Sequence, residues 1–166
     1  MKSLFWFRRD LRLEDNAGLY EALKATNSVV PVFVFDRNIL DELNDPRDAR
    51  VTFIHDEIIR LQAELKELGS TMVVRYGKPE EWLPELVEQY GAKKVYTNRD
   101  YEPYAKQRDQ EIRDALAPLG AEMLDFKDHV IFNRDEVVKS DGTPYVVFTP
   151  YKKQWLNKLM ERHAID

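Results

Sequence analysis

Short apolar runs recur along the chain, and longer segments with helical spacing separate them. The first run, residues 4–7, has four bulky apolar side chains without alternation and is followed at once by Arg8, Arg9 and Asp10. A run of this kind is typical of a strand covered on both faces, as in a parallel sheet. Because unpaired charges are costly to bury, the chain must reach the surface after this strand. Further strands are predicted over residues 29–35, 72–74, 95–96 and 123–126.

Apolar residues in the intervening segments recur every three or four positions, which is the spacing of one helical face. The first helix is predicted to begin after a cap at Asp15 or Asn16. Its inner face is predicted to hold Leu19, Ala22 and Leu23. A longer helix is predicted before Gly69, and its apolar stripe comprises Ile54, Ile58, Leu61, Leu65 and Leu68.

Two further helices are predicted to begin with a proline and to end before a glycine, the usual asymmetry of helix ends. Pro79 and Gly91 bound the first, and Pro103 and Gly120 bound the second. Strands that alternate with helices of this length imply right-handed crossovers and a mainly parallel sheet. We therefore predict an α/β fold: a Rossmann-like, doubly wound, five-stranded parallel sheet with helices on both faces and the common strand order 3-2-1-4-5.

The last part of the chain has a different pattern. Residues 130–132, 137–138 and 145–148 are predicted to form short extended pieces around a turn at residues 140–143. A final helix that carries Trp155 is predicted after Pro150. We predict that residues 1–130 form the α/β core and that residues 131–166 form C-terminal extended pieces and a helix of the same domain.

Composition narrows the classes of function. The chain has 166 residues, a net charge of −5 and no cysteine, which excludes disulfides, thiol catalysis and cysteine-bound metal clusters. No apolar run approaches the length of a membrane span, so we predict a cytoplasmic protein without a membrane partner. The three histidines, His55, His129 and His163, lack metal-ligand spacing, and no metal site is predicted. An acidic chain is also a poor unaided binder of nucleic acid.

The two most charged loops follow the first and fourth predicted strands, at residues 8–12 and 98–104. In this strand order both loops flank the point where ligands bind in open α/β sheets. Arginines that face carboxylates beside aromatic side chains would suit a flat polar ligand, or they would form an ion-pair network that only anchors the loops. Neither Walker, GxGxxG, HExxH nor GxSxG motifs occur, and no catalytic triad or acid–base pair is evident. The residues alone favour a binding domain over an enzyme.

Residues 5–16, FWFRRDLRLEDN, closely resemble the N-terminal signature of the DNA photolyase and cryptochrome family. Two further segments agree with this resemblance: DYEPY at residues 100–104, followed by Arg108 and Asp109, and PYVVFTPY at residues 144–151, followed by Trp155. The resemblance implies the α/β antenna domain found at the N-terminus of a deoxyribodipyrimidine photo-lyase. In the family this domain can hold a light-harvesting chromophore that passes excitation energy to a flavin.

The resemblance also implies the chromophore class and its contacts. Family members that use a folate carry an Asn-Glu pair where this chain has Tyr104 and Ala105, so a deazaflavin or FMN is the expected antenna chromophore and folate is less expected. The resemblance places contacts to the chromophore's ring or chain at six positions: Arg9, Phe35, Asp36, Arg50, Asp100 and Glu102.

The catalytic FAD of the family belongs to a larger helical domain that residues 1–166 do not include. The resemblance therefore implies that blue-light repair of pyrimidine dimers and contact with DNA depend on that helical domain, and that this fragment alone is inactive. Two alternatives stay open: a cryptochrome-type photoreceptor domain, and a stand-alone nucleotide- or flavin-binding α/β protein.

Overall fold

The computed structural model describes residues 2–45, 47–133 and 135–163. The chain divides into two compact units, residues 1–129 and residues 130–166, and each is described by itself. None of the helices in the described ranges has both the length and the apolar character needed to cross a membrane.

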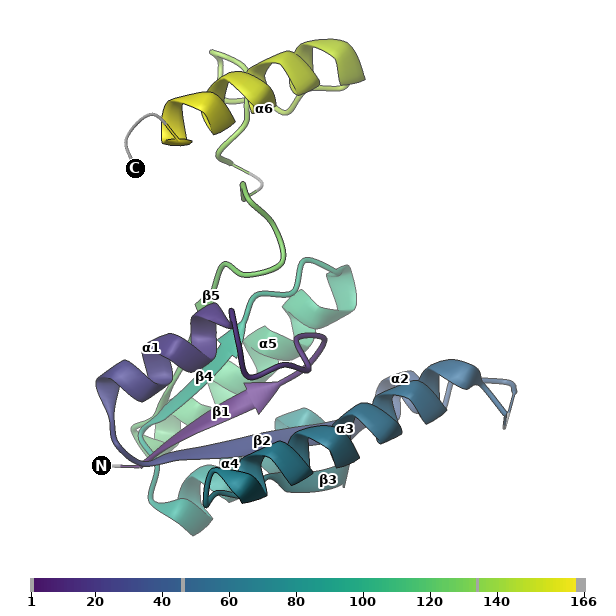
Figure 1. The fold of residues 1–166 in the computed structure, drawn as a ribbon, viewed down its shortest axis with the longest axis vertical. Coiled ribbons are helices and arrows are strands. Elements are labelled where there is room, and N and C mark those ends of the chain that lie inside the picture. The colour runs from purple at the N-terminus through teal and green to yellow at the C-terminus, as the bar shows by residue number, and fades with distance from the viewer. Residues whose placement is uncertain (1, 46, 134, 164–166) are drawn as a thin grey trace. The chain divides into compact units, whose positions relative to one another are not determined.

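A five-stranded, all-parallel sheet forms the centre of the first unit (Figure 1), and its strand order is β3-β2-β1-β4-β5. The central strand β1 is buried along its whole length, because it has a partner on both sides and helices on both faces. The predicted fold class and strand order are therefore confirmed. The strands are β1 (Ser3–Phe7), β2 (Val29–Asp36), β3 (Val73–Gly77), β4 (Lys94–Asn98) and β5 (Glu122–Phe126).

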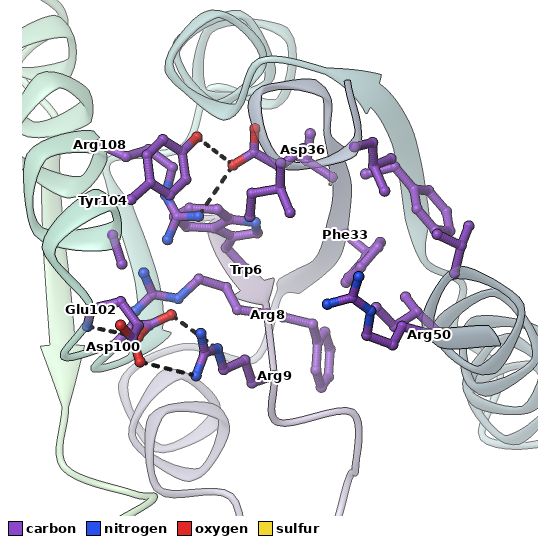
Figure 2. Close-up of a pocket in the computed structure, with 18 of the residues that line it drawn as sticks. Trp6, Arg8, Arg9, Phe33, Asp36, Arg50, Asp100, Glu102, Tyr104 and Arg108 are labelled. Carbon is purple, nitrogen blue, oxygen red and sulfur yellow. Dashed lines mark hydrogen bonds and ion pairs between the residues drawn. The ribbon is translucent and has the colours of Figure 1, made fainter. Parts of the chain in front are cut away.

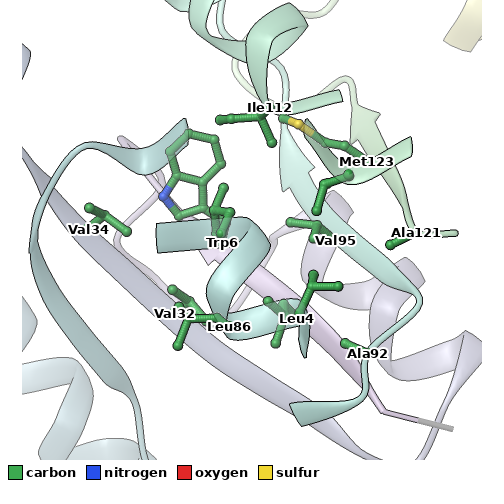
Figure 3. Close-up of a cluster of buried hydrophobic side chains, with 13 residues drawn as sticks. Leu4, Trp6, Val32, Val34, Leu86, Ala92, Val95, Ile112, Ala121 and Met123 are labelled. Carbon is green, nitrogen blue, oxygen red and sulfur yellow. The ribbon is translucent and has the colours of Figure 1, made fainter. Parts of the chain in front are cut away.

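Alternate side chains of the sheet enter two separate hydrophobic clusters. Leu4 and Trp6 of β1 pack with α4 and α5 on one face (Figure 3), whereas Phe5 and Phe7 pack with α1 and α3 on the other. This alternation explains why the first apolar run has no polar position. The helices of this unit are α1 (Ala17–Ala25), α2 (Arg37–Leu40), α3 (Ala49–Glu67), α4 (Pro79–Tyr90) and α5 (Pro103–Leu116), and the 3-10 turn η1 (Ala117–Leu119) extends α5.

The predicted helix ends are confirmed in detail. The Asn16 side chain caps α1 by accepting the Leu19 N–H. Gly91 and Gly120 follow their helices in the left-handed conformation, with φ values of 60° and 62°. Glycine tolerates this conformation because it has no Cβ.

Two apolar residues predicted to face the core are instead exposed. Leu23 lies outside the buried stripe of α1, which is limited to Gly18, Leu19 and Ala22. Leu68 is the C-cap of α3, beyond its last helical turn, and therefore projects into solvent. The short helix α2 was not predicted, since four residues are too few to show a helical period.

The second unit contains one helix, α6 (Phe148–His163), among its described residues. It begins two residues before Pro150, not after it, since proline is tolerated in a first helical turn. The predicted turn is present, because the Gly142 N–H donates to the Lys139 carbonyl and the Lys139 N–H to that of Thr143. None of the predicted extended pieces forms a strand within the described part of residues 127–147. The last predicted piece, residues 145–148, ends at Phe148, which is the first residue of α6.

Candidate functional site

A pocket of about 400 Å³ opens at the carboxyl ends of β1 and β2 and extends to the loop after β4 (Figure 2). One side is apolar, and it is formed by β2, α2, the start of α3 and the residue Leu43. The opposite side carries charged residues from the β1 and β4 loops and from α5. A parallel sheet aligns all these strand ends at one edge, which is where ligands bind in folds of this type. The main apolar lining residues are Phe33, Phe35, Ile39, Leu40, Leu43 and Ile54.

The structure brings all six predicted contact residues to the lining of this one pocket, although they come from four separate segments of the chain. They are Arg9, Phe35, Asp36, Arg50, Asp100 and Glu102. Their convergence makes the pocket the candidate site, while their contacts with a ligand stay a prediction. No group of histidine and carboxylate side chains in the described ranges is placed to hold a metal ion.

Arg9 faces the two carboxylates of the β4 loop. Its guanidinium lies 3.3 Å from the Asp100 carboxylate and 4.0 Å from that of Glu102. The Asp100 side chain also accepts the Glu102 N–H at 3.2 Å, which fixes the loop just before α5 begins at Pro103. The Arg9 side chain is 61% exposed, so these ion pairs are weak and can be exchanged for contacts with a ligand.

Arg50 lies on the other side of the pocket, at the start of α3. Its guanidinium pairs with Asp48, the N-cap of that helix, with Nη2 2.5 Å from the carboxylate. The hydrogen bond from Arg50 lowers the pKa of Asp48 to about 2, so the pair is charged at any ordinary pH. Nε and Nη2 of Arg50 both donate to Asp48, and the side chain, which is 75% exposed, presents the remaining edge of its guanidinium to an anion.

Asp36 differs from the other predicted residues because its carboxylate already has three partners. It accepts hydrogen bonds from the Tyr104 hydroxyl at 2.7 Å, from Arg108 at 3.2 Å and from the Asn38 N–H at 3.0 Å. Asp36 is only 8% exposed. It therefore holds the pocket wall together more than it offers free oxygen atoms to a ligand.

Burial and the hydrogen bond to Asp36 raise the pKa of Tyr104 from 10.0 to about 12. The folded state thus favours the protonated phenol, and the stability it contributes is fully present below about pH 10 and is lost as the pH rises to about 12. We expect the urea midpoint of the parent protein to fall relative to that of Tyr104→Phe over this interval. Tyr20→Phe, at an exposed site, serves as control. Parallel curves for the parent and Tyr104→Phe would contradict the shift.

Sequence reasoning missed a charged cluster at the inner end of the pocket. The guanidinium groups of Arg8 and Arg108 lie over the Trp6 ring, 4.9 and 4.7 Å from its centroid (Figure 2). Asp109 accepts two hydrogen bonds from Arg8, each 2.8 Å long, and one from Arg108. The signal that could have revealed this cluster is the presence of Arg8, Arg108 and Asp109 in the segments that carry the family resemblance.

The two charged loops contribute only in part to the pocket. Arg12 lies elsewhere and pairs with Asp128 at 2.8 Å. Arg99 pairs with Asp125. The expected convergence of residues 8–12 and 98–104 therefore holds for those residues of both loops that line the pocket. It does not hold for Arg12 and Arg99, whose ion pairs anchor the loops.

A buried network of hydrogen bonds holds the loop that follows β1. The Asn98 amide donates to Asp10 at 2.6 Å and to Asn16 at 2.8 Å, and its oxygen accepts the Gly18 N–H. Asp10 also accepts the N–H of Arg8 at 2.9 Å. A Cβ at Gly18 would lie 2.8 Å from the Asn98 side chain, so glycine permits this close approach.

Comparison with known proteins gives a consistent result. A sequence model of the family described as DNA photolyase matches residues 3–165. The chain is 35% identical to the deoxyribodipyrimidine photo-lyase of Synechococcus sp. over 152 residues, which cover 92% of this chain and 31% of that protein. It is 35% identical to the enzyme of the same name from Halobacterium salinarum over 164 residues, covering 93% and 34% of the two chains.

Solved structures show the same extent of similarity. The structure of a class III photolyase from Agrobacterium tumefaciens has a TM-score of 0.78 at 28% identity, covering 90% of this chain and 30% of that one. A photolyase from Sulfolobus tokodaii, described with two FAD molecules and the implication of a novel light-harvesting cofactor, has a TM-score of 0.76 at 29% identity and coverages of 93% and 34%. The chain therefore spans about a third of the length of these relatives.

Proposed function

The chain belongs to the DNA photolyase family, and from this premise we propose that its pocket binds a light-harvesting chromophore of the deazaflavin or FMN type. The observation that carries the proposal is the convergence of the six predicted contact residues on one pocket of about 400 Å³. The second FAD molecule described for the Sulfolobus tokodaii photolyase supports a flavin-type ligand in a relative of this chain.

The two sides of the pocket match the two parts of such a ligand. The apolar side, with Phe33, Phe35 and Ile54, suits a planar ring system. Asp100 and Glu102 can accept hydrogen bonds from a ring imide or from the hydroxyl groups of a ribityl chain. Arg50 can bind a phosphate, since guanidinium groups match that geometry well. Tyr104 and Ala105 line the pocket at the two positions where folate-binding members carry Asn and Glu, which supports a flavin-type ligand over a folate.

The experiment that tests this proposal is a parallel titration of the protein with FMN, a deazaflavin and a reduced folate, followed by absorption and fluorescence. We expect saturable binding of a flavin-type ligand. Replacing Asp100 and Glu102 with alanine is expected to raise its Kd at least about tenfold, because two acceptors are lost. Far-ultraviolet circular dichroism should stay unchanged.

The matched control replaces two exposed carboxylates of α4, Glu85 and Glu88, with alanine. This control should bind with the parent Kd. Absence of binding to the parent protein would contradict the proposed function. An equal Kd for the parent and the Asp100→Ala/Glu102→Ala protein would contradict the assignment of the site.

We further propose that light-driven repair of pyrimidine dimers requires sequence beyond residues 1–166, since about two thirds of each photo-lyase relative has no counterpart in this chain. Illuminated protein with added FAD should leave thymine-dimer DNA unrepaired.

A photoreceptor role is the second candidate, because the chain is 30% identical to a cryptochrome DASH from Natronomonas pharaonis over 156 residues. Repair by a full-length protein that carries these residues would favour the photolyase role.

A further inference from the structure

The indole of Trp6 lines the pocket beside two guanidinium groups. Trp6 is 2% exposed, and the centres of the Arg8 and Arg108 guanidinium groups lie 4.9 and 4.7 Å from its ring centroid. Figure 2 shows the Trp6 ring with the Arg108 guanidinium against it and the Arg8 side chain alongside. A cation over an aromatic face at this distance interacts strongly with the ring's π-electrons, the more so when water is excluded.

Both arginines are held in place by buried carboxylates. Asp109 bonds to both of them, and Asp36 bonds to Arg108. The arginine side chains are only 5% and 6% exposed. Among the described residues, neither buried Nε atom has a hydrogen-bond acceptor, although the other guanidinium nitrogens have acceptors. The Trp6 ring therefore lies against two guanidinium groups whose positions are fixed by hydrogen bonds to other residues.

This arrangement changes the ease with which Trp6 can lose an electron. One-electron oxidation converts the indole to a radical cation, which adds a positive charge to a ring that is only 2% exposed and lies within 5 Å of two existing positive charges. Burial and nearby like charges both disfavour a charged form. The carboxylates of Asp36 and Asp109 reduce this effect, but they are bonded to the guanidinium groups and not to the ring.

The resistance of Trp6 to oxidation matters when an excited flavin-type ligand occupies the pocket. An excited flavin is a strong oxidant and can take one electron from a nearby indole, which gives a flavin radical anion and an indole radical cation. Return of the electron restores both molecules, but the excitation energy is then lost as heat. If the ligand is to pass its excitation energy on, this competing electron transfer must be slow. Protein groups around a cofactor can slow it by changing how easily the cofactor or its neighbour is oxidised or reduced.

We propose that Arg8 and Arg108 suppress oxidation of Trp6 by an excited flavin-type ligand in the pocket, and so preserve its excited state. This inference rests on the proposed function and adds to it a role for two pocket residues that is separate from any direct contact with the ligand. Arg8 and Arg108 are positioning residues in this sense, because they act on the ligand through Trp6.

The test measures the fluorescence lifetime of FMN bound at saturation to four proteins: the parent, Trp6→Phe, Arg108→Met and the double variant. We expect equal lifetimes for the parent and Trp6→Phe, since Trp6 does not quench when both arginines are present. Arg108→Met should shorten the lifetime roughly two- to fivefold, the rate factor that one cation–π interaction represents. The double variant should regain the parent lifetime. Arg108 also lies over the Tyr104 ring, 5.3 Å from its centroid, so all four proteins carry Tyr104→Phe as well, which removes a second side chain that Arg108→Met would make easier to oxidise.

A longer lifetime in Trp6→Phe than in the parent would overturn the inference, and this comparison stands even if Arg108→Met does not fold. A shortening in Arg108→Met that persists in the double variant would also overturn it, because the quencher would then be another group. Binding of FMN with either result leaves the proposed function intact. Failure of both FMN and a deazaflavin to bind the parent protein would overturn the proposed function and, with it, this inference.

Discussion

Replacement of Asp109 by alanine is expected to lower the free energy of unfolding by about 3 to 5 kcal/mol, the usual effect of removing one partner from a buried ion pair. Asp109 accepts from Arg8 twice at 2.8 Å and from Arg108 at 3.2 Å, and both arginine side chains are buried. Without it, Arg8 loses its carboxylate partner although its side chain is only 5% exposed. Urea unfolding followed by circular dichroism measures this loss.

Asp114→Asn on the same helix is the control for the Asp109 experiment. Asp114 is exposed and accepts a hydrogen bond from exposed Gln110 one helical turn away, so its replacement should change the free energy by less than about 0.5 kcal/mol. An equally small effect of Asp109→Ala would show that the buried charges are compensated in some other way. The variant should also loosen the contact of Arg8 with Trp6, so we expect the tryptophan emission to shift to longer wavelength.

Replacement of Asn98 by alanine is expected to lower the free energy of unfolding by about 2 to 3 kcal/mol. The Asn98 side chain makes three hydrogen bonds with Asp10, Asn16 and Gly18 in an almost fully buried place. Its removal leaves a buried backbone N–H without an acceptor and a buried carboxylate with one donor fewer. Each such loss costs about 1 to 3 kcal/mol.

Hydrogen exchange measures the same change at a single amide, because the Gly18 N–H should lose its protection from exchange in Asn98→Ala. The control is Gln89→Ala, which removes an exposed amide from α4. Gly18 protection that is the same in both variants would show that the N–H is held by something other than Asn98.

The architecture could be predicted because its signals are local. The helix boundaries depend on Asn16, on Pro79 and Pro103, and on the glycines that follow the helices, and these residues act within one turn of their own position. The strands appear as uninterrupted apolar runs because both faces of the sheet are covered. The extended pieces expected near residue 146 depend on something not local, since a strand needs a neighbour to pair with, and none lies there in the described residues.

The candidate site was predictable only as a set of positions and not as a network. Arg8 and Asp109 are 101 residues apart in the chain, and no spacing rule links them. Arg108 lies within a charged helix, where a solvated face is the normal expectation, and its burial follows from the packing of α5 against β1. Asp36 lines the pocket, but its three existing hydrogen bonds become visible only when Tyr104 and Arg108 are brought beside it.

The position of β1 between β2 and β4 has a consequence for synthesis of the chain. One edge of this apolar strand finds its partner only after residues 94–98 have been made, almost ninety positions later. At about 5 to 20 residues per second, the nascent chain holds that edge open for on the order of ten seconds. A strand edge without a partner can pair with strands of other chains. Ribosome-bound intermediates that end before β4 are therefore the species in which this protein is most exposed to aggregation and to chaperone binding.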